Sequence, residues 1–169
     1  TSYLAGFGIG TQKIEEMAAQ MFPEAKLLRM DLDTTSKKGG HEKILSAFAK
    51  GKADILIGTQ MIVKGHDFPG VTLVGVLAAD VSLYAPDYTA AERTFQLLVQ
   101  AAGRAGRGRK AGIALIQTYM PEHYSIQTAT SQDYESFFKQ EMGYRRLMHY
   151  PPACHMLSMQ VAGENEELM

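Results

Sequence analysis

The sequence contains very little cysteine: Cys154 is the only one among its 169 residues. One thiol cannot form an internal disulfide, and zinc sites built on cysteines need more than one of them. The neighbouring His155 does not complete a tetrahedral site, so we interpret Cys154 as a buried thiol with a structural role. The sequence therefore excludes a disulfide scaffold and predicts no metal centre of its own.

Long apolar runs and an excess of one charge are also missing. No apolar run reaches the roughly 18 residues that a membrane-spanning helix needs, and no signal-peptide pattern opens the chain, so we expect a cytoplasmic protein without membrane contact. The formal net charge of −1 argues against a uniformly basic coat for nucleic acid. Any such binding must be local, and the basic residues form two local clusters: Lys37, Lys38, His41 and Lys43, and Arg104, Arg107, Arg109 and Lys110.

A phosphate-binding loop of the Gly-Lys-Ser/Thr type is absent as well. The glycine-rich residues 6–13 lead into a helix, for which Thr11 is the expected N-cap, but no strand precedes them and no Gly-Lys-Ser/Thr follows. We interpret them as a structural turn. The chain also begins at Thr1 rather than at a methionine, and from this we expect a segment cut from a longer protein.

Helix and strand patterns alternate along the first 120 residues. Apolar residues recur at helical spacing in two segments, and short apolar runs typical of strands lie at 26–30, 55–57, 71–79 and 112–118. The run over 71–79 is almost uninterrupted, which predicts a strand buried on both faces. This order with short connections predicts a parallel α/β sheet with helices on both faces.

The most informative stretch, residues 96–109, joins an apolar helix pattern to alternating glycines and arginines in QLLVQAAGRAGRGR. Glycines lack a Cβ, so backbone and ligand can approach closely where Arg104 and Arg107 are presented. A guanidinium offers a planar fork of donors and keeps its charge, which suits a phosphate whose charge grows in a transition state. One arginine so placed contributes about 10³ to 10⁵ in rate. A basic surface loop after a helix is the alternative interpretation.

A second informative stretch, residues 54–71, reads DILIGTQMIVKGHDFPGV. Its apolar run breaks at Thr59, as a central parallel strand does when it delivers a loop to the carboxyl edge of a sheet, where ligands bind. Gly65 permits a tight turn and Asp67 supplies an acceptor. We expect the arginines and the Gly65 loop to lie together at this carboxyl edge. An ordinary loop between a strand and a helix is the alternative.

Two pairs of residues leave their roles open. Asp31 and Asp33 follow the strand over 26–30 and, without a third acidic ligand, they favour capping of backbone donors or contact with a missing partner over a metal site. Arg145 and Arg146 lie near the end of a helical segment, where they suit the helix dipole and DNA contact equally well.

The character of the sequence changes at Pro121. We predict a domain over 1–120, a helical extension over 121–149 and the start of a truncated further domain over 150–169. In the last part, apolar residues alternate over 157–161 as they do in a strand.

The arginine stretch and the Gly65 stretch carry a resemblance to a known family. QAAGRAGR resembles motif VI of superfamily 2 helicases, and GTQMIVKGHDFP resembles their motif V. With GIGTQKIEE, RMDLDTT, PDYTAAER and YPP, the similarity covers most of residues 6–161 and is to the bacterial primosomal replication-restart helicases. It implies the second RecA-like lobe of an ATP-dependent DNA helicase that unwinds stalled forks in the 3′ to 5′ direction and helps to reload the replicative helicase.

The resemblance also implies roles for particular residues: catalytic arginines Arg104 and Arg107, nucleotide contacts from Gln100, Gly65 and Asp67, and DNA contacts from Thr59, Gln60 and Lys64. It implies ATP and Mg²⁺ as cofactors. The implied partners are forked or junction DNA, the first RecA-like lobe of the same chain, primosome proteins and single-strand-binding proteins. The zinc-binding cysteines of the family lie in an insertion before the glycine-rich entry, so zinc would belong to the longer protein and its ligands are not in these residues.

Two other functions remain open at this point. Another superfamily 2 translocase, of the fork-reversal or transcription-repair type, would share motifs V and VI but not RMDLDTT and PDYTAAER. A catalytically silent module would use the same fold only to bind DNA or protein. Because the phosphate loop would lie in the first lobe, we predict that residues 1–169 alone lack ATPase activity in each case.

Overall fold

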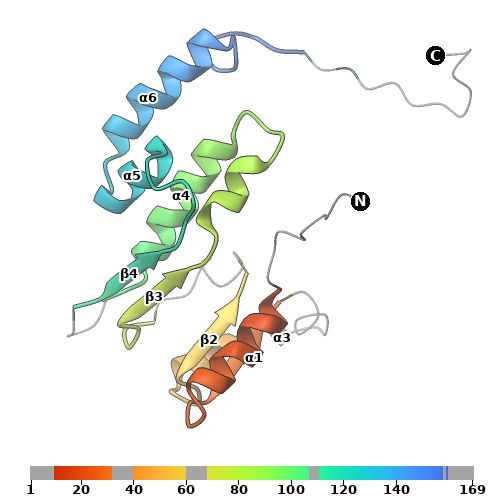
Figure 1. Ribbon diagram of the computed structural model, residues 1–169, viewed down its shortest axis with the longest axis vertical. Coiled ribbons are helices and arrows are strands. Elements are labelled where there is room, and N and C mark those ends of the chain that lie inside the picture. The colour runs from red at the N-terminus through yellow and green to blue at the C-terminus, as the bar shows by residue number, and fades with distance from the viewer. Residues whose placement is uncertain (1–9, 32–39, 60–67, 107–110, 158, 160–169) are drawn as a thin grey trace, which may run out of the picture.

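A computed structural model of the chain describes residues 10–31, 40–59, 68–106, 111–157 and 159. Helix and strand alternate along it in the predicted order up to the last strand (Figure 1). The elements are α1 (Thr11–Met21), β1 (Leu27–Met30), α3 (Gly40–Ala49), β2 (Ile55–Gly58), β3 (Leu73–Val76), the 3-10 helix η2 (Ala79–Tyr84), α4 (Ala90–Ala102), β4 (Ile113–Ile116), α5 (Tyr124–Ser131) and α6 (Tyr134–Leu147).

The strands pair in parallel, as predicted, but they form two ladders. Strand β1 pairs with β2 and strand β3 pairs with β4, and among the described residues no ladder joins the two pairs. The expectation of one sheet is therefore not met there. An apolar run fits any position in a parallel sheet, so the sequence pattern that identifies strands does not specify which edges pair.

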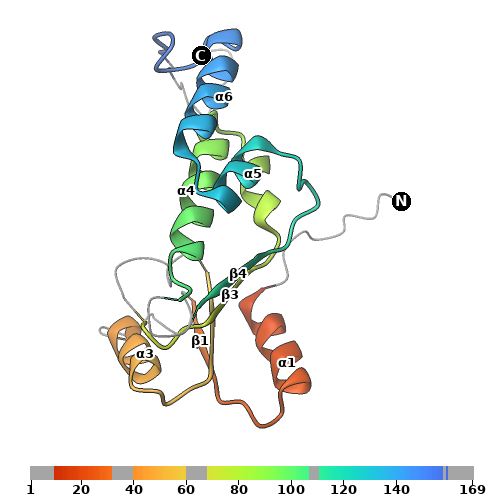
Figure 2. The same ribbon diagram turned by 90° about the vertical axis from the view of Figure 1, so that its left-hand side faces the viewer.

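The two ladders differ in how their faces are covered. Helices α1 and α3 lie on opposite sides of the β1–β2 ladder, as predicted (Figure 2). The β3–β4 ladder has α4 on one side, where Val76 and Ile116 pack against the buried side chains of that helix. Its other side leaves Leu73 and Leu115 exposed. The prediction that the run over 71–79 is buried on both faces is therefore wrong for this structure.

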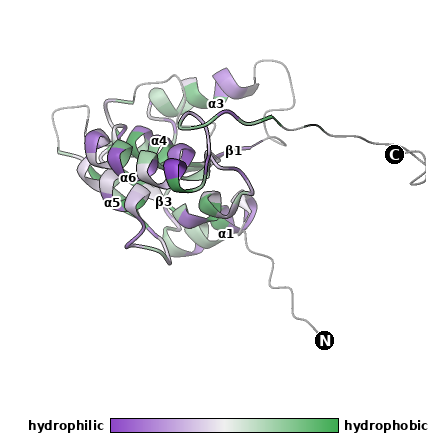
Figure 3. Cartoon of the chain, turned by 90° about the horizontal axis from the view of Figure 1, so that it is seen from above, coloured by the Kyte–Doolittle hydropathy of each residue, from purple (hydrophilic) through white to green (hydrophobic). Residues whose placement is uncertain are grey.

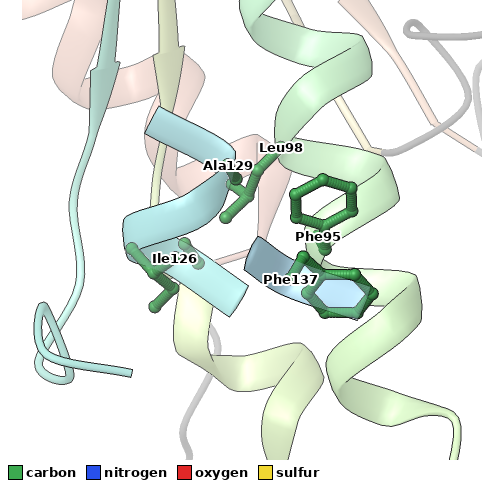
Figure 4. Close-up of a cluster of buried hydrophobic side chains, with 6 residues drawn as sticks. Phe95, Leu98, Ile126, Ala129 and Phe137 are labelled. Atoms are coloured by element: carbon green, nitrogen blue, oxygen red, sulfur yellow. The ribbon is translucent and has the colours of Figure 1, made fainter. Parts of the chain in front are cut away.

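The larger hydrophobic core lies between the β3–β4 ladder and the helices α4, α5 and α6 (Figure 4). Phe95 of α4 and Phe137 of α6 stack with ring centroids 4.2 Å apart. Leu98 from α4 and Ile126 and Ala129 from α5 fill the space beside them. The helical spacing of the apolar residues in α4 is the reason that one side of this helix is buried along its whole length.

The smaller core lies between the β1–β2 ladder and α3. Met30, Leu45 and Phe68 are its buried members, and the ring of Phe48 meets that of Phe68 edge-on at 5.2 Å. Helix α1 has no buried residue. Seen from above, the helices contain both hydrophobic and hydrophilic residues (Figure 3), as amphipathic helices of an α/β domain do.

The predicted helical extension consists of two helices, α5 and α6. Gln132 separates them because it adopts a left-handed backbone with a φ of 55°, and the Asp133 side chain then accepts the Ser136 N–H as the N-cap of α6. Beyond α6 the predicted strand over 157–161 does not form in its two described residues, 157 and 159. Within the described parts of the chain, no helix is both long and apolar enough to span a membrane.

Candidate nucleotide and nucleic-acid site

The arginine loop, residues 103–106, is a turn that continues from the end of α4. Its first two backbone N–H groups still bond to the helix, Gly103 to the Val99 carbonyl at 2.9 Å and Arg104 to the Ala101 carbonyl at 3.0 Å. Arg104 is half-buried, whereas Arg107 lies outside the described residues. Gln100 is exposed in the last turn of α4, four positions before Arg104. The structure thus holds Arg104 on a short extension of a buried helix.

Two glycines let the arginine loop meet the start of β4. Gly106 has a φ of +76°, and a Cβ on it would lie 2.9 Å from the Cα of Gly112. A Cβ on Gly112 would lie 2.6 Å from the Cα of Gly106. Neither position has room for a side chain. The sequence interpretation attributed the glycines of the loop to a ligand and did not single out Gly112, but here the close approach is between two segments of backbone.

The arginine loop is also tied to the end of the Gly65 stretch. The Gly106 N–H donates to the carbonyl of Val71 at 3.0 Å. Val71 packs against the smaller core, in which the preceding Phe68 is buried. The end of the Gly65 stretch and the end of motif VI are therefore neighbours in space. Gln60, Lys64, Gly65 and Asp67, the other motif V residues singled out in the sequence, lie outside the described residues.

The position of the arginine loop on the strands differs from the expectation. Val71 precedes β3 and Gly112 precedes β4, so the loop lies at the amino ends of these strands. Thr59, which directly follows β2 and is exposed, does lie at a carboxyl end. The expectation that Arg104 lies at the carboxyl edge is therefore wrong, and for Arg107 it stays a prediction. The physical reason is that each connection between parallel strands must run back along the sheet, so α4 returns the chain to the amino ends.

Asp31 lies directly after β1 and is buried. Its Oδ2 atom accepts the Thr11 hydroxyl at 2.7 Å and lies 3.0 Å from Nε of Arg29. Asp31 thus joins β1 to the start of α1, which answers the question that the sequence left open. Thr11 is the first residue of that helix, and Gly10 rather than Thr11 is its N-cap. Asp33 lies outside the described residues, among which no three His, Cys, Asp or Glu residues gather as metal ligands.

The family of helicase conserved C-terminal domains matches residues 8–109, which include both the Gly65 stretch and the arginine loop. The chain belongs to this helicase C-terminal domain family. The match confirms the helicase resemblance and the RecA-like α/β fold class that the motifs predicted.

Curated relatives of this helicase C-terminal domain cover nearly the whole chain. It is 56% identical over 164 residues to the replication restart protein PriA of Bacillus subtilis and 47% identical over 164 residues to that of Synechocystis, in both cases over 97% of the chain. It is 49% identical over 150 residues, or 89% of the chain, to the replication restart protein PriA of Chlamydia pneumoniae. In each comparison the chain spans about a fifth (20%) of the relative's length.

Beyond the family match, a buried arginine fastens the helical extension to α4. Arg145 is 6% exposed. Its Nη2 lies 2.7 Å from Glu92 on α4, its Nε lies 2.7 Å from Glu141 on α6, and its Nη1 donates to the Pro151 carbonyl at 2.9 Å. The guanidinium also lies over the Tyr88 ring, 5.4 Å from its centroid. The helicase C-terminal domain thus continues into a helical unit joined to the start of α4, the helix that leads into the arginine loop.

The electrostatics of this network favour a charged Arg145. Burial lowers the pKa of Arg145, but hydrogen bonds to Glu141 and Glu92 outweigh it, and the net shift is upward. Burial together with the hydrogen bond that its hydroxyl donates to Glu141 raises the pKa of Tyr124, so this hydroxyl stays protonated. The sequence left open whether Arg145 has a structural role or contacts DNA, and these contacts show a structural role. The neighbouring Arg146 is exposed.

The Arg145 network was not predicted from the sequence, although one of its contacts has a recognisable sequence pattern. Glu141 precedes Arg145 by four positions, the spacing at which helical side chains pair. The second partner, Glu92, is 53 positions away, and no local pattern predicts that contact.

Proposed function

We propose that this chain is the second RecA-like lobe of an ATP-dependent DNA helicase that unwinds in the 3′ to 5′ direction and acts in replication restart. The family match over both motifs supports the helicase part, and the similarity to replication restart proteins favours replication restart over fork reversal or transcription repair. The observation that carries the proposal is the hydrogen bond from the Gly106 N–H to the Val71 carbonyl, because it joins the arginine loop to the end of the Gly65 stretch, two residues after motif V.

In this proposal Arg104 and Arg107 face ATP bound between this lobe and the first RecA-like lobe of the longer protein. Their guanidinium groups would stabilise the negative charge that develops on the transferred phosphoryl group. Gln100, Gly65 and Asp67 would contact the nucleotide. Mg²⁺ would neutralise phosphate charge, and its ligands would come from the first lobe and not from a cluster among the described residues, where no three potential metal ligands gather. Zinc, too, would be bound by residues of the longer protein that lie outside this chain.

DNA binding would take place at the opposite ends of the strands. Thr59, at the carboxyl end of β2, would contact a DNA phosphate together with Gln60 and Lys64. The Gly65 stretch includes both Thr59 and Val71, so it has one residue at the DNA end of the lobe and another at the arginine end. Closure of the two lobes on ATP would then move Thr59 along the DNA strand, because Phe68 anchors the segment in the smaller core.

The proposed partners follow from the same assignment. They are forked or junction DNA, the first lobe of the same chain, primosome proteins and single-strand-binding proteins. Strand displacement on a fork labelled on either arm measures the polarity of unwinding. Displacement in the 5′ to 3′ direction would contradict the proposal.

The arginine assignment has a direct test in the longer protein. We expect Arg104→Ala and Arg107→Ala each to lower the DNA-stimulated rate of ATP hydrolysis by about 10³ to 10⁵, with a smaller change in nucleotide affinity. Arg146→Ala, which removes an exposed arginine from the last turn of α6, is the matched control and should leave the rate of hydrolysis without DNA unchanged. Normal turnover in both loop variants would remove the assignment.

A further inference from the structure

The β3–β4 ladder has an uncovered side, which we call the open face and define by Leu73, Gly75 and Leu77 from the β3 segment and Ile113 and Leu115 from β4. Leu73 is 58% exposed, Leu77 55%, Ile113 61% and Leu115 59%. In the ladder Leu73 lies opposite Ile113 and Gly75 opposite Leu115, so these side chains form one continuous apolar surface. Their neighbours Val76 and Ile116 point the other way, into the larger core.

An exposed face of this kind is unusual for a parallel ladder. Parallel strands occur almost entirely in sheets whose two faces are both covered, and a two-stranded ladder is marginal on its own. The four exposed aliphatic side chains stand together without a charged residue among them. A contiguous apolar surface of this sort marks a place where another segment packs.

Gly75 gives a second and independent indication. It lies inside β3, where glycine weakens a strand, and a Cβ built on it would meet no atom within 4 Å. Its position opposite Leu115 therefore leaves the middle of the open face without a side chain on β3. Glycine in a strand often marks close approach by another segment, and on the α4 side of the ladder no such approach requires it.

We propose that the open face is covered, in the longer protein, by the apolar side of a helix from a part of the same polypeptide outside residues 1–169, lying across Gly75. This proposal rests on the proposed function in one respect: it requires that residues 1–169 are part of a longer helicase chain. The chain spans 20% of its relatives' length, and the rest of such a chain is the source of the helix.

A helix of the same chain fits the open face better than the other occupants. Both sides of the β1–β2 ladder are covered by helices, and α4 covers the remaining side of β3–β4 (Figure 2). A second copy bound through the same face would stack one parallel sheet on another, whereas the faces of parallel sheets are normally covered by helices. DNA would need positive charge, and the open face has none.

The first experiment is hydroxyl-radical footprinting of the longer protein, read by mass spectrometry at single residues. Val76 and Ile116 are the matched references, because they lie on the same strands and face the larger core. We expect Leu73 and Leu115 to be modified as slowly as Val76 and Ile116, and several-fold more slowly than in the unfolded protein. Modification of Leu73 and Leu115 at the unfolded rate would overturn the proposal.

Dilution separates the same chain from a second copy. A contact within one polypeptide does not depend on protein concentration. The protection of Leu115 from hydroxyl radicals should therefore not change on dilution. Protection that disappears on dilution would overturn the proposal in favour of self-association. None of these readouts depends on ATP hydrolysis, so their failure would leave the arginine assignment standing.

The second experiment uses Gly75→Leu in the longer protein. In the present structure the new side chain would meet open space, but under a covering helix it would collide with that helix. We expect the melting temperature to fall by a few degrees. Gly143→Leu, at a glycine of α6 with equally open surroundings, is the matched control and should not lower it. An unchanged melting temperature for Gly75→Leu would contradict the proposal.

Discussion

The two halves of the molecule are built from the same parallel pairing but are packed to different degrees. Among the residues that the structure describes, the half around β1 and β2 has helices on both sides and a core with three buried members, Met30, Leu45 and Phe68. Counted in the same way, the half around β3 and β4 has six buried members in its core and, in addition, the buried Arg145 network. The arginine loop extends from the better-packed half, and Thr59 extends from the other. We infer that the loop has the more rigid support.

The largest expected effect concerns the network that holds α4 to α6. Arg145→Met removes the cation and leaves the buried Glu141 with the Tyr124 hydroxyl but without its cationic partner, which should lower the free energy of unfolding by about 3 to 5 kcal/mol. Urea unfolding of the chain measures this loss. Arg146→Met, one position further along α6 and exposed, should change it by about 0.5 kcal/mol or less. If both variants lost the same free energy of unfolding, the Arg145 network would not contribute to the tighter packing of the half around β3 and β4.

A pair of core leucines sharpens the comparison. Leu98→Ala in α4 and Leu45→Ala in α3 remove the same atoms from side chains that are 2% and 0% exposed. Both should cost about 2 to 5 kcal/mol, and Leu98→Ala should lie at the upper end because its larger cluster has less freedom to collapse around the cavity. Unfolding free energies of the two variants decide the order. If Leu45→Ala lost more free energy of unfolding than Leu98→Ala, the half around β1 and β2 would be the more tightly packed one.

A smaller effect is expected where α1 meets β1. Thr11→Val keeps the shape of the side chain but removes the hydroxyl that donates to Asp31, and it should cost about 1 kcal/mol. Hydrogen exchange should then report faster opening of α1 without a matching change in α4. Thr130→Val is the control, because the Thr130 hydroxyl bonds only within its own exposed helix turn. Faster exchange in both helices would show that the two halves open together.

The smallest effect is a pH dependence at the start of α5. His123 accepts the Ser125 N–H as N-cap, and burial lowers the pKa of His123 below its usual value of 6.5. Folding therefore favours the neutral form of His123. The stability that this form contributes is complete above pH 6.5, and it is lost as the pH falls through the lower pKa that His123 has in the folded protein. Melting temperatures from neutral to mildly acidic pH measure this loss. His123→Asn keeps an N-cap acceptor and should flatten the pH profile between those limits.

Much of the fold follows from local patterns in the sequence. The apolar periodicity correctly predicted the order of elements from α1 to β4 and the parallel pairing. The motifs correctly identified the helicase family, because the combination of glycines and arginines in QAAGRAGR is specific. The roles of Arg104 and Arg107 stay predictions until the variants are measured.

Other features of the candidate site could not be predicted in this way. The division into two ladders depends on which strand edges meet, and the requirement for Gly112 depends on the backbone of Gly106, which approaches it only in the fold. Arg145 finds Glu92 across 53 positions of sequence. In each case the partners are distant in the chain, and periodicity carries no information about them.

The amino-acid sequence by itself determined which segments form helices and strands and which family the chain belongs to, because both depend on residues that are near one another in the chain. Only the tertiary structure decided that the arginine loop lies at the amino ends of β3 and β4 while Thr59 lies at the carboxyl end of β2. The physical reason is that parallel strands force every connection to return along the sheet, and this return brings Gly106 to Val71.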